Sequence, residues 1–286
     1  MSQHSIIFCG TPEFACPCLQ ALHDDPTFDV TAVITQPDKP AGRKKVLSVP
    51  AVKTLAEKLG IPILQPENIN TAVLPENAPD FLVTASYGQK LSSEVLQYPN
   101  IAALNIHPSL LPHLRGPSPV PNSILMGEKE TGVTIQRMAE EIDSGPILAQ
   151  ETVTIEPRET KDRLLERLFI IGSELLIHTI NQPLHETPQD ESKATYCKKL
   201  TRSVGHVDPK EMTAEEIDRH VRALVPWPGV RTTIKDEEVK LIETALEEST
   251  DAFAVECKDD TTLCILKIQS PGKSIVTGAE WGRGKS

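Results

Sequence analysis

The chain has 286 residues, 39% of them hydrophobic, and a formal net charge of −11 at pH 7. This composition supports a packed core and excludes a wholly disordered chain, and the acidic balance argues against a general nucleic-acid binder. The N-terminal sequence lacks the basic and long apolar regions of a signal peptide, and no apolar run reaches the roughly 20 residues of a membrane span. We therefore expect a cytoplasmic protein that does not contact a membrane.

The first half of the chain alternates short apolar runs with helical patterns. The apolar or β-branched runs, which predict strands, span residues 6–9, 30–35, 61–64, 80–85 and 101–107. Helical patterns lie between them at 13–22, with Pro12 at the first helical position, and at 49–59 and 91–96. Residues 36–48, rich in proline, glycine and cations, predict a loop. This alternation is typical of the α/β class, with a mostly parallel sheet and helices on both of its faces.

The second half predicts two more strands, a long helix and a small β-rich region. The strands cover residues 133–138 and the run that begins at Ile147, and apolar residues at helical spacing follow Thr160. Thr213 and Glu216 form the pattern of a capping box at the start of a helix that ends at Leu224. Short strands at 230–234, 239–244, 253–257 and 262–268 then suit a small barrel. We divide the chain into a first domain at 1–182, a linker at 183–207 and a second domain at 208–286.

The six cysteines are scattered along the chain, at positions 9, 16, 18, 197, 257 and 264. Only Cys16 and Cys18 are close in sequence. A structural zinc site usually needs a second pair of ligands, and no second close pair of cysteines is present. We therefore predict reduced thiols, with no disulfide and no bound metal.

The stretch "ALNIHPSLLPHLRGPSP", residues 103–119, ends a predicted strand in two polar side chains. Strand residues i and i+2 share a face, so Asn105 and His107 project together and Ile106 projects oppositely. They lie at the carboxyl end of the strand, the edge at which open α/β sheets bind ligands. After Pro108 we expect a loop whose backbone groups are free to contact a ligand. In the alternative interpretation, Asn105 caps a turn and His107 is a hydrogen-bonded core histidine.

A third polar position follows in "TGVTIQRMAEEIDSGPILAQ", where Asp143 lies in a loop between two strand-like runs. An aspartate at the tip of such a loop is commonly a turn residue. Its alternative role is that of a carboxylate partner for His107, which would support the imidazole as a cation.

Together, "NIHPSLLPHLRG" and "GVTIQRMAEEIDSG" resemble the signature of the folate-dependent formyltransferases. The opening "IIFCGTPEFA", the loop "TQPDKPAGRKK" and the later "YCKKL" and "PWPG" narrow the resemblance to the branch that formylates initiator methionyl-tRNA, over nearly the whole chain. The resemblance implies a Rossmann-like domain followed by an OB-like β-barrel that contacts tRNA. It also implies 10-formyltetrahydrofolate as formyl donor and initiator methionyl-tRNA as acceptor, in translation initiation. We expect the protein to be a monomer.

The resemblance assigns catalysis to three polar side chains. Asn105 and His107 would stabilise the oxyanion that forms when the amine attacks the formyl carbon directly, and Asp143 would help to accept the amine proton. The amine is already a competent nucleophile and the formyl group is already activated, so this chemistry calls for neither a covalent enzyme intermediate nor a metal.

Two further groups of residues would bind the substrates. The stretch associated with the folate comprises Ser109, Leu110, Leu111 and Pro112. The basic run of a loop that reaches the acceptor end of the tRNA comprises Arg43, Lys44 and Lys45. On its own, such a run of cations is more often a solvated surface.

The sequence departs from the family pattern at two places. Pro117 and Pro121 stand where the family has Ala and Gln, and in the linker motif Asp208 is followed by Pro209 where the family has Trp. The first departure could alter the packing of the loop beside the folate, and the second could alter the connection between the two domains.

Two other functions stay open. One is formylation of an amino sugar or a nucleotide, which the basic loop and the second domain disfavour. The other is folate or RNA binding without catalysis, which the three polar side chains disfavour.

Overall fold

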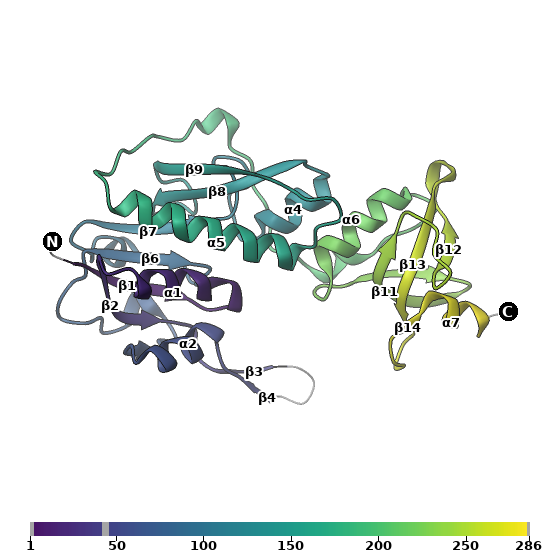
Figure 1. Ribbon diagram of the computed structural model, residues 1–286, viewed down its shortest axis with the longest axis horizontal. Helices are drawn as coiled ribbons and strands as arrows, with labels where there is room; N and C mark the ends of the chain where they lie inside the picture. The colour runs from purple at the N-terminus through teal and green to yellow at the C-terminus, as the bar shows by residue number, and fades with distance from the viewer. Residues whose placement is uncertain (1–2, 42–45, 285–286) are drawn as a thin grey trace. The chain divides into compact units, whose positions relative to one another are not determined.

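The computed structural model describes residues 3–41 and 46–284, and the chain forms two compact units. The larger unit contains residues 1–116, 130–154 and 165–196, and the smaller one contains 117–129, 155–164 and 197–286. Figure 1 shows that the larger unit is built on one sheet with helices packed against it, and that most strands of the smaller unit follow one another in the chain. No helix of the described residues is long and apolar enough to cross a membrane.

The larger unit is built on a seven-stranded sheet in the order β5-β2-β1-β6-β7-β8-β9. The first five of these strands pair in parallel, whereas β8 is antiparallel to both β7 and β9. The prediction of a mostly parallel sheet is confirmed. The bounds are β1 His4–Gly10, β2 Phe28–Ile34, β5 Ile63–Leu64, β6 Phe81–Ala85, β7 Ala102–His107, β8 Glu130–Arg137 and β9 Ile147–Thr154.

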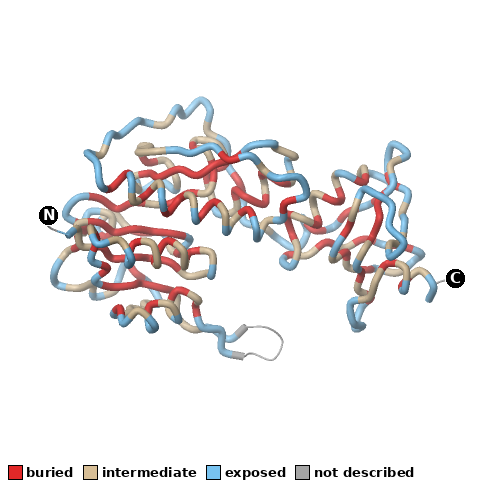
Figure 2. The backbone as a smooth tube through the Cα atoms, in the orientation of Figure 1, coloured by how far each residue is buried: buried red, intermediate tan, exposed pale blue. Residues whose placement is uncertain are grey.

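Helices cover both faces of this sheet. One apolar cluster joins the sheet to α1 (Cys16–Asp24), α2 (Ala51–Leu59) and α5 (Lys161–Ile180), and a second cluster on the other face includes α3 (Ser93–Leu96). The strands β1, β6, β7 and β8 between them are largely buried, as Figure 2 shows, whereas β9 is mostly half-buried or exposed. The predicted helix at 13–22 begins later than expected, because residues 13–15 form a 3-10 turn and Pro17 occupies the first turn of α1 in place of Pro12.

The predicted loop at 36–48 is partly ordered into strands. Its described residues include β3 (Lys39–Ala41) and β4 (Val46–Ser48), which pair antiparallel. The cations predicted to bind RNA, Arg43, Lys44 and Lys45, lie outside the described residues.

The smaller unit contains the β-rich region that the sequence predicts. Its antiparallel sheet has the order β10-β11-β13-β12, with β14 paired to β13. The strand bounds are β10 Val230–Ile234, β11 Glu237–Ala245, β12 Phe253–Glu256, β13 Thr262–Gln269 and β14 Val276–Thr277. The helices are α4 Pro119–Met126, α6 Ala214–Leu224 and α7 Gly278–Arg283. The capping box of α6 is confirmed, because Thr213 Oγ1 accepts from Glu216 N and the Glu216 carboxylate accepts from Thr213 N.

A glycine in α5 sets how closely this helix approaches the sheet. A Cβ atom at Gly172 would lie 2.7 Å from Cγ2 of Ile106 and 2.9 Å from Cγ2 of Val133, both of them buried core residues. Contacts this short require the helix or the two side chains to move.

We expect Gly172→Ala to lower the free energy of unfolding by about 1–3 kcal/mol, because the overpacking outweighs the better helix propensity of alanine. Guanidinium denaturation followed by circular dichroism measures the change. Gly284→Ala is the matched control, since a Cβ there meets no atom closer than 3.5 Å. A Gly172→Ala protein as stable as the wild type would contradict the tight packing.

Candidate active site

The carboxyl end of β7 presents two polar side chains to one face of the sheet. Ile106 packs into the cluster that contains α5, whereas Ala103 belongs to the cluster on the other face. Asn105 and His107 alternate with Ile106, so they lie on the same face as Ala103. In the neighbouring strand β8, Gln136 is paired with Asn105 and Thr134 with His107. The geometry expected from the period of two is confirmed.

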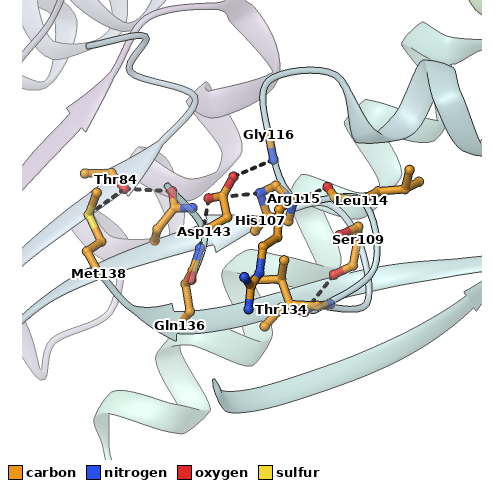
Figure 3. Close-up of polar contacts among 12 residues, drawn as sticks. Thr84, His107, Ser109, Leu114, Arg115, Gly116, Thr134, Gln136, Met138 and Asp143 are labelled. Carbon is orange, nitrogen blue, oxygen red and sulfur yellow. Dashed lines mark hydrogen bonds and ion pairs between the residues drawn. The ribbon is translucent and has the colours of Figure 1, made fainter. Parts of the chain in front are cut away.

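The amide of Asn105 is held by one hydrogen bond from the adjacent strand. Thr84 of β6 donates from Oγ1 to Asn105 Oδ1 over 2.7 Å (Figure 3). In this orientation of the amide, Oδ1 is the atom that Thr84 engages. The Nδ2 atom takes part in none of the hydrogen bonds found among the described residues, so its donors are available to a ligand.

His107 is 4% exposed, and both of its ring nitrogens face acceptors. Its Nε2 lies 3.0 Å from the carbonyl oxygen of Leu114, and its Nδ1 lies 3.5 Å from Asp143 Oδ1. A carbonyl can only accept, so Nε2 must carry a proton. A second proton on Nδ1 would turn the contact with Asp143 into an attractive ion pair. The histidine is therefore hydrogen-bonded within the core and also paired with the carboxylate.

The carboxylate of Asp143 is fixed by donors from two other parts of the chain. Gln136 Nε2 donates to Oδ1 over 3.0 Å, and the backbone N–H of Gly116 donates to Oδ2 over 2.8 Å. Asp143 has a φ of 57°, in the left-handed region, and its side chain is only 12% exposed. A simple turn residue needs no such environment. The structure thus brings Asp143 to His107 (Figure 3). Asn105 lies two residues before His107, on the same face of β7.

Gln136 is a residue of this site that sequence reasoning missed. It is 1% exposed, and its Oε1 has no hydrogen-bond partner among the described residues. Such a buried, unpaired acceptor costs about 1–3 kcal/mol. The signal that could have revealed Gln136 is the pairing register of β7 with β8, which places it beside Asn105.

The stretch from Ser109 to Pro112 is bonded to the protein more fully than expected. Thr134 Oγ1 donates to the Ser109 carbonyl over 2.6 Å and accepts from the Leu111 N–H over 3.1 Å. Gln150 Nε2 donates to the Leu111 carbonyl over 2.9 Å. The expectation that these backbone groups are free for a ligand is therefore wrong, because polar side chains of β8 and β9 already pair with them.

The side chains of this stretch divide into two classes. Ser109 and Leu111 are buried, whereas Leu110 and Pro112 are half-buried. Leu110 lies against the backbone of Gly132, where a Cβ would come within 2.4 Å of Leu110 Cδ2. Only the half-buried pair is placed to contact a ligand without rearrangement.

The cysteines are unpaired thiols in this structure. Burial raises the pKa of the Cys18 thiol to about 12, so it stays protonated at neutral pH. In the described part of the chain, no group of three or more His, Cys, Asp or Glu residues could hold a metal ion.

Gly145 determines the path of the loop that carries Asp143. A Cβ at this position would lie 1.8 Å from the carbonyl oxygen of Arg137 and 3.0 Å from its carbon. These are backbone atoms of the neighbouring strand, so they cannot turn away as a side chain can.

We expect Gly145→Ala to displace the loop. The kcat of the formyl transfer that the sequence predicts should then fall by about 10²-fold, which is typical of a misplacement near 1 Å. Steady-state kinetics with a thermal unfolding curve for each variant measures the effect. The control is Ser144→Ala in the same loop, which removes only a hydrogen bond to the Glu141 carbonyl. Normal turnover in Gly145→Ala would show that the loop path does not matter.

Comparison with known proteins identifies the family. A formyl transferase domain model matches residues 3–180, and a model of the formyl transferase C-terminal domain matches residues 199–286. The chain is 38% identical to the methionyl-tRNA formyltransferase of Lysinibacillus sphaericus, in an alignment that covers 98% of this chain and 96% of that protein. It is 39% identical to the methionyl-tRNA formyltransferase of Enterococcus faecalis, covering 98% of this chain and 95% of that protein.

Solved structures share the fold at lower sequence identity. An N-formyltransferase from Helicobacter canadensis, in complex with folinic acid and dTDP-3-aminofucose, superposes with a TM-score of 0.69 at 19% identity, covering 94% of this chain and 100% of that one. A methionyl-tRNA formyltransferase from Clostridium thermocellum superposes with a TM-score of 0.61 at 14% identity, covering 96% and 100%. With both domain models matched and relatives alike over nearly the full length, the chain belongs to the formyl transferase family, in the branch of the methionyl-tRNA formyltransferases.

Proposed function

We propose that this formyltransferase transfers the formyl group of 10-formyltetrahydrofolate to the amino group of methionine on initiator methionyl-tRNA. The observation that carries the proposal is the meeting of Asn105, His107 and Asp143 at one strand end. The relatives named methionyl-tRNA formyltransferase support the choice of acceptor. Transfer by direct attack of the amine requires one group that stabilises negative charge on the formyl oxygen and one group that takes the amine proton.

Asn105 is the best-supported donor to the formyl oxygen. Its Oδ1 is engaged by Thr84, which leaves the two N–H donors of Nδ2 for a ligand. One preorganised donor of this kind lowers the barrier by about 3 kcal/mol. Thr84 is therefore part of the arrangement, because its hydroxyl holds the amide oxygen on the side of β6.

His107 contributes mainly through its charge in this geometry. Both ring nitrogens face groups of the protein, so direct donation to the formyl oxygen would require Nε2 to exchange the Leu114 carbonyl for the substrate. As an imidazolium held at 3.5 Å from Asp143, His107 would place a positive charge beside the reacting atoms. A buried charge acts strongly on a transition state because little water screens it.

Asp143 is the acceptor for the amine proton, directly or through one water. A carboxylate has about four acceptor directions. Gln136 and Gly116 each use one of them, and His107 approaches a third. One direction is thus left for a substrate proton. General-base assistance of this kind is worth about 10²–10⁴ in rate.

The residues present suit a folate donor, which when bound supplies an activated formyl carbon. Asn105 Nδ2 offers two donors at this strand end. Leu110 and Pro112 would provide the apolar contact of the folate stretch, with Ser109 and Leu111 supporting them from the core. Two solved structures that share the fold are complexes with tetrahydrofolic acid and with folinic acid, respectively.

We assign tRNA contact to Arg43, Lys44 and Lys45 and to the second domain at 208–286, beyond a linker at 183–207. The support for this part is the sequence pattern and the likeness to relatives named methionyl-tRNA formyltransferase. We take the active form to be a monomer that works in translation initiation.

The acceptor test supplies purified protein and 10-formyltetrahydrofolate with one of three acceptors. These are charged initiator methionyl-tRNA, uncharged initiator tRNA and an amino-sugar nucleotide. We expect formylation of the charged tRNA alone, because only this acceptor presents the methionyl amine. Mass spectrometry of the released amino acid or nucleotide detects the product. Formylation of the amino sugar in preference to the charged tRNA would overturn the proposed acceptor.

The catalytic assignment is tested by Asn105→Ala and Asp143→Asn. We expect each to reduce kcat by about 10²–10³-fold, because one removes the donor to the formyl oxygen and the other removes the proton acceptor. Stopped or quenched formyl-transfer assays give kcat and KM, and circular dichroism verifies folding. If either folded variant turned over at the wild-type rate, its residue would have no place in the chemistry.

A further inference from the structure

The loop that carries Asp143 is held by a side chain from a distant part of the chain. Gln189 lies 46 residues beyond Asp143, after α5, and its Nε2 donates to the Asp143 carbonyl over 2.8 Å and to the Gly145 carbonyl over 2.7 Å. Asp143 has a φ of 57°, a conformation that costs energy in any residue but glycine. The two N–H groups of one amide thus fix the backbone on both sides of Ser144.

The orientation of the Gln189 amide follows from its partners. Its Oε1 accepts from Arg115 Nε over 3.0 Å and from Arg115 Nη2 over 2.8 Å. A guanidinium can only donate and a carbonyl can only accept. The oxygen must therefore face Arg115, and the nitrogen must face the Asp143 loop.

Arg115 is itself rigidly placed. It is 1% exposed, and its Nη1 and Nη2 donate to the two carboxylate oxygens of Glu191 over 2.9 and 2.7 Å. These bonds raise the pKa of Arg115 and lower the pKa of the Glu191 carboxyl, so both groups remain charged at neutral pH. A bidentate pair of this kind fixes both the direction and the distance of the guanidinium.

Arg115 stands between two residues that touch the site. The carbonyl of Leu114 accepts from His107 Nε2, and the N–H of Gly116 donates to Asp143 Oδ2 (Figure 3). Gln189 therefore joins the segment that contacts His107 to the loop that carries Asp143. These contacts close a ring in which the Gln189 amide holds the backbone of the loop, while Gln136 and the Gly116 N–H hold the Asp143 carboxylate itself.

We propose that Gln189 is a positioning residue for formyl transfer, which sets the Asp143 carboxylate against His107 through its two donors. The inference rests on the proposed role of Asp143. The segment that carries Gln189 is anchored independently of its side chain, because Thr187 exchanges two backbone hydrogen bonds with Ile147 and Thr195 pairs with the backbone of Arg115. Loss of the amide should therefore disturb the loop more than the fold.

Two substitutions separate the donors from the rest of the side chain. Gln189→Glu keeps the size and an acceptor for Arg115, but it cannot donate to either carbonyl. Gln189→Met keeps the approximate size and removes all hydrogen bonding without adding charge. The matched control is Glu186→Gln on the same segment, which alters only a contact with the half-exposed Arg137.

We expect both Gln189 variants to lose about 10–10² in kcat, because the carboxylate is misplaced, while KM for each substrate changes by less than about threefold. Glu186→Gln should retain wild-type kcat. The double variant Asp143→Asn with Gln189→Met should be no slower than Asp143→Asn alone, because Gln189 acts through Asp143. Kinetics are measured below the onset of unfolding for every variant.

Three results would overturn the inference in distinguishable ways. If the Gln189 variants keep kcat while Asp143→Asn loses it, the positioning role fails and the proposed function stands. If Asp143→Asn keeps the wild-type kcat, Asp143 has no catalytic role, and the inference about Gln189 is wrong as well. If the double variant shows the product of the two single losses, Gln189 acts independently of Asp143 and its role is structural.

Discussion

The contact between the imidazole of His107 and the carboxylate of Asp143 is the constraint on which the site depends. Both groups are largely buried, and a buried charge without partners is costly. The protein meets this cost with neutral donors and acceptors at fixed positions. Gln136 and Gly116 serve the carboxylate, and the Leu114 carbonyl serves the ring. Because these partners come from separate segments, the pair can exist only in the folded unit.

The sequence could predict the parts of this arrangement that depend on local rules. The period of two along β7 placed Asn105 and His107 on one face, and alternation of strands with helices predicted the mostly parallel sheet. The start of the first helix was harder to predict. Pro12 and Pro17 both suit the first turn of a helix, and the local sequence does not distinguish between them. The helix α4 gave no clear pattern, since its first turn contains two prolines.

Contacts between distant segments could not be predicted in the same way. Gln136 required the register of β7 with β8, and Gln189 required knowledge of where the chain runs after α5. The same limit explains the wrong expectation for the loop after Pro108. No partner for its backbone is visible in the local sequence, yet Thr134 supplies both a donor and an acceptor from another strand. Polar residues on the inner face of a strand are the signal that such a partner exists.

A loop that holds the Asp143 carboxylate in a left-handed backbone conformation cannot be stable by itself. Its residues are too few to bury apolar surface, and Gly145 is squeezed against the Arg137 carbonyl. The energy that maintains it must come from elsewhere, and here the visible sources are the strand residue Gln136 and the distant residue Gln189. The segment after α5 is polar and poor in regular structure, which in sequence is typical of a connection between domains. Its residues up to Tyr196 nevertheless belong to the compact unit that contains Asp143, to which Gln189 and the backbone of Thr187 and Thr195 are hydrogen-bonded.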